Sequence, residues 1–134
     1  MPTVFHSMKV DATDGMPLRG QSATTLGIRQ SDFDIHPVTT IVAQNGKGTS
    51  VSPSCSQLPQ SLRPRKFPGG LGGKNLFCFK LGTGPWQSGI VAPGLDLFAD
   101  PNDLDHGFMT PEAPMPLKDL EVAMEATRPH WQIV

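Results

Sequence analysis

The chain has 134 residues, of which 37% are hydrophobic, and its formal net charge at pH 7 is −1. Single domains cluster near ~100–150 residues, so this length predicts one domain over residues 1–134 with one modest core. The near-neutral charge argues against the broad basic surface of a nucleic-acid binder, and no segment approaches the ~18 apolar residues of a membrane span.

The first predicted strand covers residues 3–10, where His6 lies on the same face as apolar neighbours. Residues 11–20 form a turn-rich loop, and residues 22–27 suit one helical turn between a serine cap and a glycine stop. Residues 31–37 are short and irregular. The whole chain holds 14 glycines and 14 prolines, which favours a backbone that lies largely in turns and ordered loops.

The middle of the chain predicts further short strands. Residues 39–43 are β-branched and end at an Asn-Gly turn, and residues 49–52 follow as a second short strand that a proline closes. Residues 58–73 combine prolines with a run of glycines and are predicted to be a flexible loop. Residues 75–81 alternate strongly, so we expect a strand whose phenylalanine face is buried.

The C-terminal part predicts strands at residues 90–91, 95–98 and 106–110, followed by a helix at residues 116–128. A proline suits the first position of that helix, apolar residues recur at a spacing of three to four, and Pro129 ends it. Together these elements predict the α+β class, with short, broken strands and one terminal helix.

Cys55 and Cys78 are too few to define a disulfide framework, and no Cys/His spacing suits zinc. We therefore expect two ordinary thiols and no metal site. The first residues lack the basic start and apolar run of a signal peptide, which predicts a cytoplasmic protein, with export by a route that uses no cleavable signal as the alternative. The one basic cluster, residues 63–66, is expected to be a solvated loop.

Several catalytic patterns can be tested and set aside. The segment Gly46-Lys47-Gly48-Thr49-Ser50 lacks the spacing of a phosphate-binding loop, and the following Ser-Pro blocks a helix. The Asp32/Asp34 and Asp103/Asp105 pairs have no apolar surroundings that would raise a pKa for acid/base work. No G-x-S-x-G elbow supports a Ser-His-Asp triad.

Four segments, in order, resemble the family of the Pseudomonas type VI secretion exported effector two and its bacterial and fungal relatives. Val4-Phe5-His6 resembles the first strand of that family, and residues 22–29 with Asp34-Ile35 resemble the next stretch of its fungal members. Gly48-Thr49-Ser50-Val51 resembles its Gly-Thr-Ser-Val segment. His106 with Pro111, Pro114-Met115 and a helix reaching Trp131 resembles its C-terminal part.

The resemblance implies an ADP-ribosyltransferase-like fold, in which a split β-sandwich of short strands with few helices encloses a cleft for NAD. It also implies a toxin that acts in the cytoplasm on an unknown intracellular acceptor, and a cognate immunity protein if the source is bacterial. The family's threonine–serine pair and histidine correspond to Thr49, Ser50 and His106, which are the expected catalytic residues. Its first-strand arginine corresponds to His6. The late-strand glutamate of ordinary transferases has only Glu112 as a candidate, beyond a proline.

The chemistry of cleaving the nicotinamide–ribose bond agrees with these residue types. Hydroxyl groups can donate to or accept from the ribose. His6 or Arg29 can meet the diphosphate, with the arginine doing so through two hydrogen bonds. Phe33 or Phe108 can stack on a ring, which completes the expected NAD-binding set. His106 can orient the ribose or act as a general base.

Other interpretations stay open at this stage. The chain can be a non-enzymatic toxin or interaction module on the same fold, which the missing late-strand acid favours. It can also be an RNA-directed phosphotransferase or nuclease that uses His6, Lys9 and His106 around a phosphate, although a nucleic-acid partner is not what the overall charge favours. Each site residue also has a purely structural interpretation, such as a half-buried, hydrogen-bonded histidine at position 6.

Overall fold

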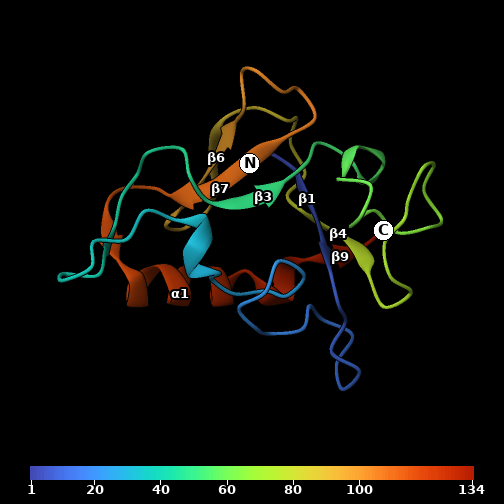
Figure 1. The fold of residues 1–134 in the computed structure, drawn as a ribbon, viewed down its shortest axis with the longest axis horizontal. Coiled ribbons are helices and arrows are strands. Elements are labelled where there is room, and N and C mark those ends of the chain that lie inside the picture. The colour runs from blue at the N-terminus through green and yellow to red at the C-terminus, as the bar shows by residue number, and fades with distance from the viewer.

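The computed structural model describes residues 1–134 as a small α+β domain made mostly of strands (Figure 1). Nine strands, one α-helix and three single 3-10 turns follow one another along the chain. Their order is β1 (Val4–Met8), η1 (Gln30–Asp32), β2 (Ile41–Val42), β3 (Thr49–Val51), η2 (Cys55–Gln57), β4 (Phe77–Leu81), β5 (Gly89–Ala92), β6 (Leu95–Ala99), β7 (Gly107–Pro111), β8 (Met115–Pro116), α1 (Leu117–Ala126), η3 (Arg128–His130) and β9 (Gln132–Ile133).

The strands form three small sheets. One has the order β1-β4-β9, the second has the order β3-β7-β6-β5, and β2 pairs with β8 in the third; every strand pair within them is antiparallel. A bridge between Phe5 and Ser52 brings β1 beside the end of β3, so the two larger sheets meet along this line. In Figure 1 helix α1 runs below the β3-β7-β6-β5 sheet, and the chain continues from its C-terminal end through η3 to β9 of the other large sheet.

One main core fills the space between the sheets and the helix. It contains the apolar face of β1, the inward residues of β4, β6 and β7, and the buried face of α1. Phe79, Leu120 and Met109 are fully buried in this core, and the Trp131 side chain, which also belongs to it, is 6% exposed. Helix α1 fully buries Leu120 and Met124, Leu117 and Ala123 pack partly buried against the core, and Val122 is exposed on the outer face.

The predicted strands are largely confirmed, and their ends differ for local reasons. The strand expected at 39–43 begins only at Ile41, because Thr40 has a φ of 57° that no strand residue adopts. The helix ends at Ala126 rather than 128, because a 3-10 turn that contains Pro129 follows it. The helical turn expected at 22–27 is wrong: this segment is a non-helical turn. On β4, Phe79 is buried as expected, but Phe77 is 40% exposed.

The prediction of two free thiols is wrong, because Cys55 and Cys78 form a disulfide. The bond joins η2 to β4 and, with Leu58, forms a second, smaller core against Phe5 and Phe67. Sequence spacing does not indicate it, since the two cysteines are 23 residues apart. They meet because β1 pairs with β4 on one side and is bridged to Ser52, just before η2, on the other.

Arg128 anchors the turn-rich loop at residues 11–20 to the end of the helix. It is 4% exposed, and it donates to the Pro17 carbonyl oxygen over 2.9 Å and to the carboxylates of Asp14 and Asp11 over 2.8 and 3.2 Å. This guanidinium therefore does more than complement the helix dipole: it holds an N-terminal loop against the C-terminal end of the core.

No helix of the structure has both the length and the apolar character that crossing a bilayer requires.

We expect Arg128→Met to lower the free energy of unfolding by about 2 kcal/mol, because it leaves two partly exposed aspartates without their buried cation. Arg19→Met is the matched control and should change the free energy of unfolding much less than Arg128→Met, since Arg19 pairs with Glu125 on the open surface. The hydrogen bond from Arg128 lowers the pKa of Asp14, so the difference between parent and Arg128→Met should shrink as the pH falls below the ordinary value of 3.8. Urea unfolding measures both effects. An equal loss in the free energy of unfolding for Arg128→Met and Arg19→Met would contradict the anchoring role of Arg128.

Candidate functional site

Strand β1 places His6 between the two larger sheets. Alternation along β1 turns His6 to the core face, opposite Phe79 of β4, and the side chain is only 6% exposed. Its ring lies 6.4 Å from the ring of Trp131. Burial lowers the pKa of His6 from 6.5 to about 4, against the opposing effects of a hydrogen bond with the Ser50 backbone and the charge of Asp32. His6 is therefore a neutral imidazole at pH 7.

Strand β3 places the two hydroxyls beside His6. Thr49 and Ser50 pair with Met109 and Phe108 of β7. The approach is close at Gly48, where a Cβ would come within 2.0 Å of the Met109 carbonyl oxygen, so only glycine allows β3 to begin here. The Thr49 Oγ1 atom is buried and has no hydrogen-bond partner, which is uncommon for a buried hydroxyl.

His106 approaches the hydroxyl pair from the turn that immediately precedes β7. Its Nε2 atom is in hydrogen-bond contact with the Ser50 hydroxyl, and its ring stands edge-on to Phe108 at a centroid distance of 4.6 Å. The backbone of His106 is fixed on both sides: its N–H donates to the Asp103 carbonyl oxygen over 3.1 Å, and its carbonyl oxygen accepts from the Asp100 N–H, also over 3.1 Å. The imidazole is thus aimed at β3 by a tight turn.

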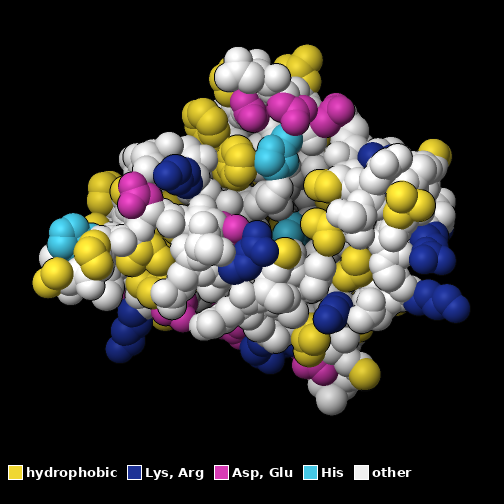
Figure 2. Space-filling view, viewed as in Figure 1, with side chains coloured by type: hydrophobic (Ala, Val, Ile, Leu, Met, Phe, Trp, Pro, Cys, Tyr) yellow, Lys and Arg dark blue, Asp and Glu magenta, His cyan; other side chains and the backbone are white.

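A narrow cavity lies where these strands meet. His6, Arg29, Thr49 and Ser50 line it together with Asp32 and the turn at residues 22–27. The cavity volume is about 30 Å³, which is room for a water molecule rather than for a large ligand. Arg29 forms a two-pronged ion pair with Asp32, with its closest contact at 2.8 Å, at the rim. The face in Figure 2 shows histidine, acidic and basic side chains around a central hollow.

The structure therefore brings together five of the seven residues expected at the site, and Phe108 reaches the group through its contact with His106. Phe33 does not join them: it is 7% exposed, packs in the main core, and does not line the cavity. Glu112 lies at the opposite end of β7 from His106, and its carboxylate accepts from the Gly94 N–H over 3.2 Å. No late-strand glutamate lines the cavity.

Asp32 is the site residue that sequence reasoning missed. The sequence presents Asp32 only as one of a carboxylate pair with Asp34, whereas the structure places Asp32 on the cavity wall, where it pairs with Arg29. The spacing of three residues between Arg29 and Asp32 was the available signal. Further from the cavity, the Gln57 amide donates to the Asp105 carboxylate over 2.6 Å and links η2 to the turn that carries His106.

The buried neutral His6 should make stability depend on pH. The unfolded chain takes up a proton near pH 6.5, whereas the folded chain does so only near 4, so stability falls as the pH drops through this window. From this residue we expect the free energy of unfolding to decrease by about 2 kcal/mol between pH 7 and pH 5. His6→Gln should remove that decrease, while His130→Gln, at an exposed position, should retain it. Denaturant titrations at pH 7 and pH 5 measure this decrease. The prediction is contradicted if the free energy of unfolding of His6→Gln falls between the two pH values as much as that of the parent.

Comparisons of this chain with protein-family models, with curated proteins and with solved structures find no match. The resemblance of its short segments to the exported toxin family therefore stays a prediction. The cavity lined by His6, Thr49 and Ser50, with His106 in contact with Ser50, is the basis on which a function can be proposed. These residues come from β1, from β3 and from the turn before β7.

Proposed function

We propose that this chain is an ADP-ribosyltransferase-like toxin domain that binds NAD at the cavity between β1 and β3 and transfers ADP-ribose to an intracellular acceptor. In this proposal the protein acts in the cytoplasm of a target cell, and an immunity protein neutralises it if the source is bacterial. One observation carries the proposal: His6, Thr49 and Ser50 line one cavity, and His106 contacts Ser50. These residues are up to 100 positions apart in the sequence.

The donor set suits a ribose and a diphosphate. The unpaired, buried Thr49 hydroxyl needs a partner, and a ribose hydroxyl would supply one. The Arg29 guanidinium, half-exposed at the rim, can exchange the Asp32 carboxylate for a phosphate. The volume of about 30 Å³ is far below the ~300–1,000 Å³ of typical ligand sites, so binding requires that the segment bearing Arg29 and Asp32 move outward.

NAD supplies a glycosidic bond whose cleavage leaves positive charge on the ribose. The residues around the cavity have three tasks in that reaction. Ser50 and Thr49 hold the ribose hydroxyls, and His106, in contact with Ser50, accepts a proton from an attacking hydroxyl or orients the ribose. The neutral His6 ring adds a hydrogen-bonding group without adding a positive charge that would oppose the developing cation.

A second candidate is a toxin of the same fold that binds its target without cleaving NAD. Two observations favour it: the cavity is small, and Asp32, already paired with Arg29, is the one acidic residue on its wall. Incubation of the purified chain with NAD labelled in the nicotinamide ring distinguishes the two candidates. A transferase or glycohydrolase releases labelled nicotinamide, whereas a binding module does not.

Thr49→Val tests the site without disturbing the fold. Removing a buried hydroxyl that has no partner should leave the free energy of unfolding unchanged or raise it slightly, because valine has nearly the same shape. If the hydroxyl binds the ribose, affinity for NAD should fall about fivefold or more. Calorimetric titration with NAD and urea unfolding measure the two quantities. A Thr49→Val chain that is as stable and binds NAD as tightly as the parent would contradict the assignment.

A further inference from the structure

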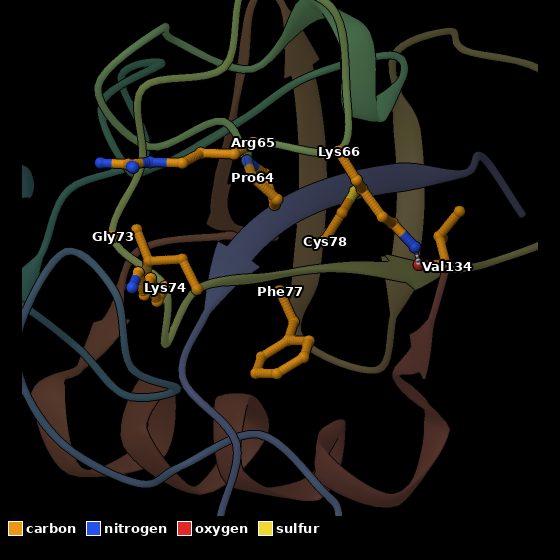
Figure 3. Close-up of a pocket in the computed structure, with 9 residues that line it drawn as sticks. Pro64, Arg65, Lys66, Gly73, Lys74, Phe77, Cys78 and Val134 are labelled. Carbon is orange, nitrogen blue, oxygen red and sulfur yellow. Dashed lines mark hydrogen bonds between the residues drawn. The ribbon is translucent and has the colours of Figure 1, made fainter.

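A second pocket, here called the basic pocket, lies between the loop that carries Pro64, Arg65 and Lys66 and the start of β4 at Phe77 and Cys78 (Figure 3). Its volume is about 280 Å³, several times that of the cavity at His6. Arg65, Lys66 and Lys74 stand around it, and all three side chains are exposed. None of them forms a salt bridge with an Asp or Glu side chain, unlike Arg19, Arg29 and Arg128. Lys66 Nζ donates to the Val134 carbonyl oxygen over 2.7 Å, and a phosphate on Lys66 would share this ammonium group with that oxygen (Figure 3).

Three of the side chains that line the basic pocket are cationic, and none is Asp or Glu. The charged residues are also unevenly distributed along the chain. Residues 35–95 contain six of the 11 basic residues of the chain and none of its 12 acidic residues. The net charge of −1 hides this segregation, because the acidic residues are gathered in the rest of the chain. Figure 2 shows Lys and Arg side chains at the right-hand edge, where the loop before β4 lies in Figure 1, and a row of acidic side chains at the top. A polyanion would therefore be drawn to one edge of the molecule.

The loop that presents these cations is firmly braced. Arg63 donates to the Leu58 carbonyl oxygen over 2.9 and 2.8 Å and to the Pro68 carbonyl oxygen over 2.6 Å. Arg65 Nε donates to the Gly72 carbonyl oxygen over 3.1 Å, which leaves the outer nitrogens of its guanidinium free. The Cys55–Cys78 disulfide ties the floor of the pocket to η2. The loop at residues 58–73, which was expected to be flexible and solvated, is thus held in place by these hydrogen bonds, with its cationic side chains at the surface.

An aromatic ring completes the surface. Phe77 lines the basic pocket at the start of β4 and is 40% exposed. In Figure 3 its ring projects from β4 on the side away from Pro64 and Lys66, at the end of the strand where Lys74 lies. An unpaired base can stack on such a ring while neighbouring phosphates meet the cations, which is how single strands are held without sequence preference.

We propose that the basic pocket binds single-stranded nucleic acid, with its backbone phosphates on Arg65, Lys66 and Lys74 and a base stacked on Phe77. This binding does not depend on NAD or on the residues of the first cavity. A duplex, whose bases are already stacked, would use only the cations, so the exposed ring favours a single strand. An acidic protein segment would likewise leave the ring without a role.

The test is fluorescence anisotropy of the full chain with a labelled, mixed-sequence single-stranded RNA of about twelve nucleotides over a salt series. We expect saturable binding whose logarithm falls with the logarithm of salt concentration at a slope of about −2, as three phosphate contacts predict. Lys66→Glu with Lys74→Glu should abolish binding. Lys47→Glu with Lys118→Glu makes the same change in net charge at exposed sites outside the pocket and should leave binding within about twofold.

Phe77→Ala separates stacking from charge. It should weaken binding about fivefold or more without changing the salt slope, because it removes a stacked base and no phosphate contact. The proposal is overturned if the parent does not bind, if both double variants weaken binding equally, or if Phe77→Ala binds like the parent. It is also overturned in favour of an acidic protein partner if poly-glutamate competes as well as unlabelled RNA at equal charge.

Discussion

Replacing His106 with alanine is expected to lower the rate of nicotinamide release by about a hundredfold or more, which is the usual contribution of a positioned acid–base group. The physical reason is that His106 is the one imidazole in hydrogen-bond contact with the hydroxyl pair, through Ser50. A continuous assay of NAD cleavage measures the effect in the purified chain, and growth of cells that express the chain in the cytoplasm measures it in vivo.

A second variant at the site and a control variant outside it distinguish loss of the proposed chemistry from loss of folding. Ser50→Ala removes a single oxygen atom from a partly buried position, so it should fold normally and still lose most of the activity. His130→Ala is the matched control, because His130 is exposed and lies outside the cavity. A His106→Ala chain that cleaves NAD or arrests growth as well as the His130→Ala chain would refute the site.

Reduction of the Cys55–Cys78 disulfide is expected to lower the free energy of unfolding by about 3 kcal/mol, from the entropy that a closed loop of this length removes from the unfolded chain. Unfolding in denaturant with and without a thiol reductant measures the difference. The Cys55→Ser/Cys78→Ser chain is the control: its stability should match that of the reduced parent and should not respond to reductant. Equal unfolding midpoints for the oxidised and reduced parent would contradict the prediction.

The disulfide also bears on where the chain works. Such bonds persist in oxidising compartments and are rare in the cytoplasm, where thiols are kept reduced. A toxin that enters the cytoplasm would lose the bond there and with it the tie between β4 and η2. Since Gln57 of η2 holds Asp105 beside His106, we expect reduction to loosen the turn that carries the imidazole as well as to lower overall stability.

Much of the fold could be predicted from local pattern. Alternation identified β1 and β4, and the terminal helix followed from apolar spacing and a proline at each end. The short strands β8 and β9 were missed, because two residues carry no period and exist only through their partners, β2 and β4. Phe77 departs from the alternation: it is the first residue of β4 and is 40% exposed, whereas Phe79 and Leu81 on the same face are buried.

The residues on and beside the strands of the candidate site could be expected from the sequence, whereas the path of the loop that covers the cavity could not. Thr49, Ser50 and His106 were expected from the resemblance of the segments that carry them, and the structure brings Ser50 to His106 because β3 pairs with β7. Asp32 and the burial of Phe33 depend on how the irregular segment between β1 and β2 folds back over His6, and no local rule specifies that path. The Arg128 anchor depends in the same way on contacts more than 100 residues apart in the chain.

The most direct test of the site is titration with NAD, followed through the imidazole signals of the four histidines by nuclear magnetic resonance. We predict saturable shifts of the His6 and His106 signals, because both rings border the cavity or its hydroxyls, with the His36 and His130 signals unchanged as internal controls. Signals that all stay in place, or that shift equally at all four histidines, would contradict an NAD site formed by His6, the Thr49–Ser50 pair and His106.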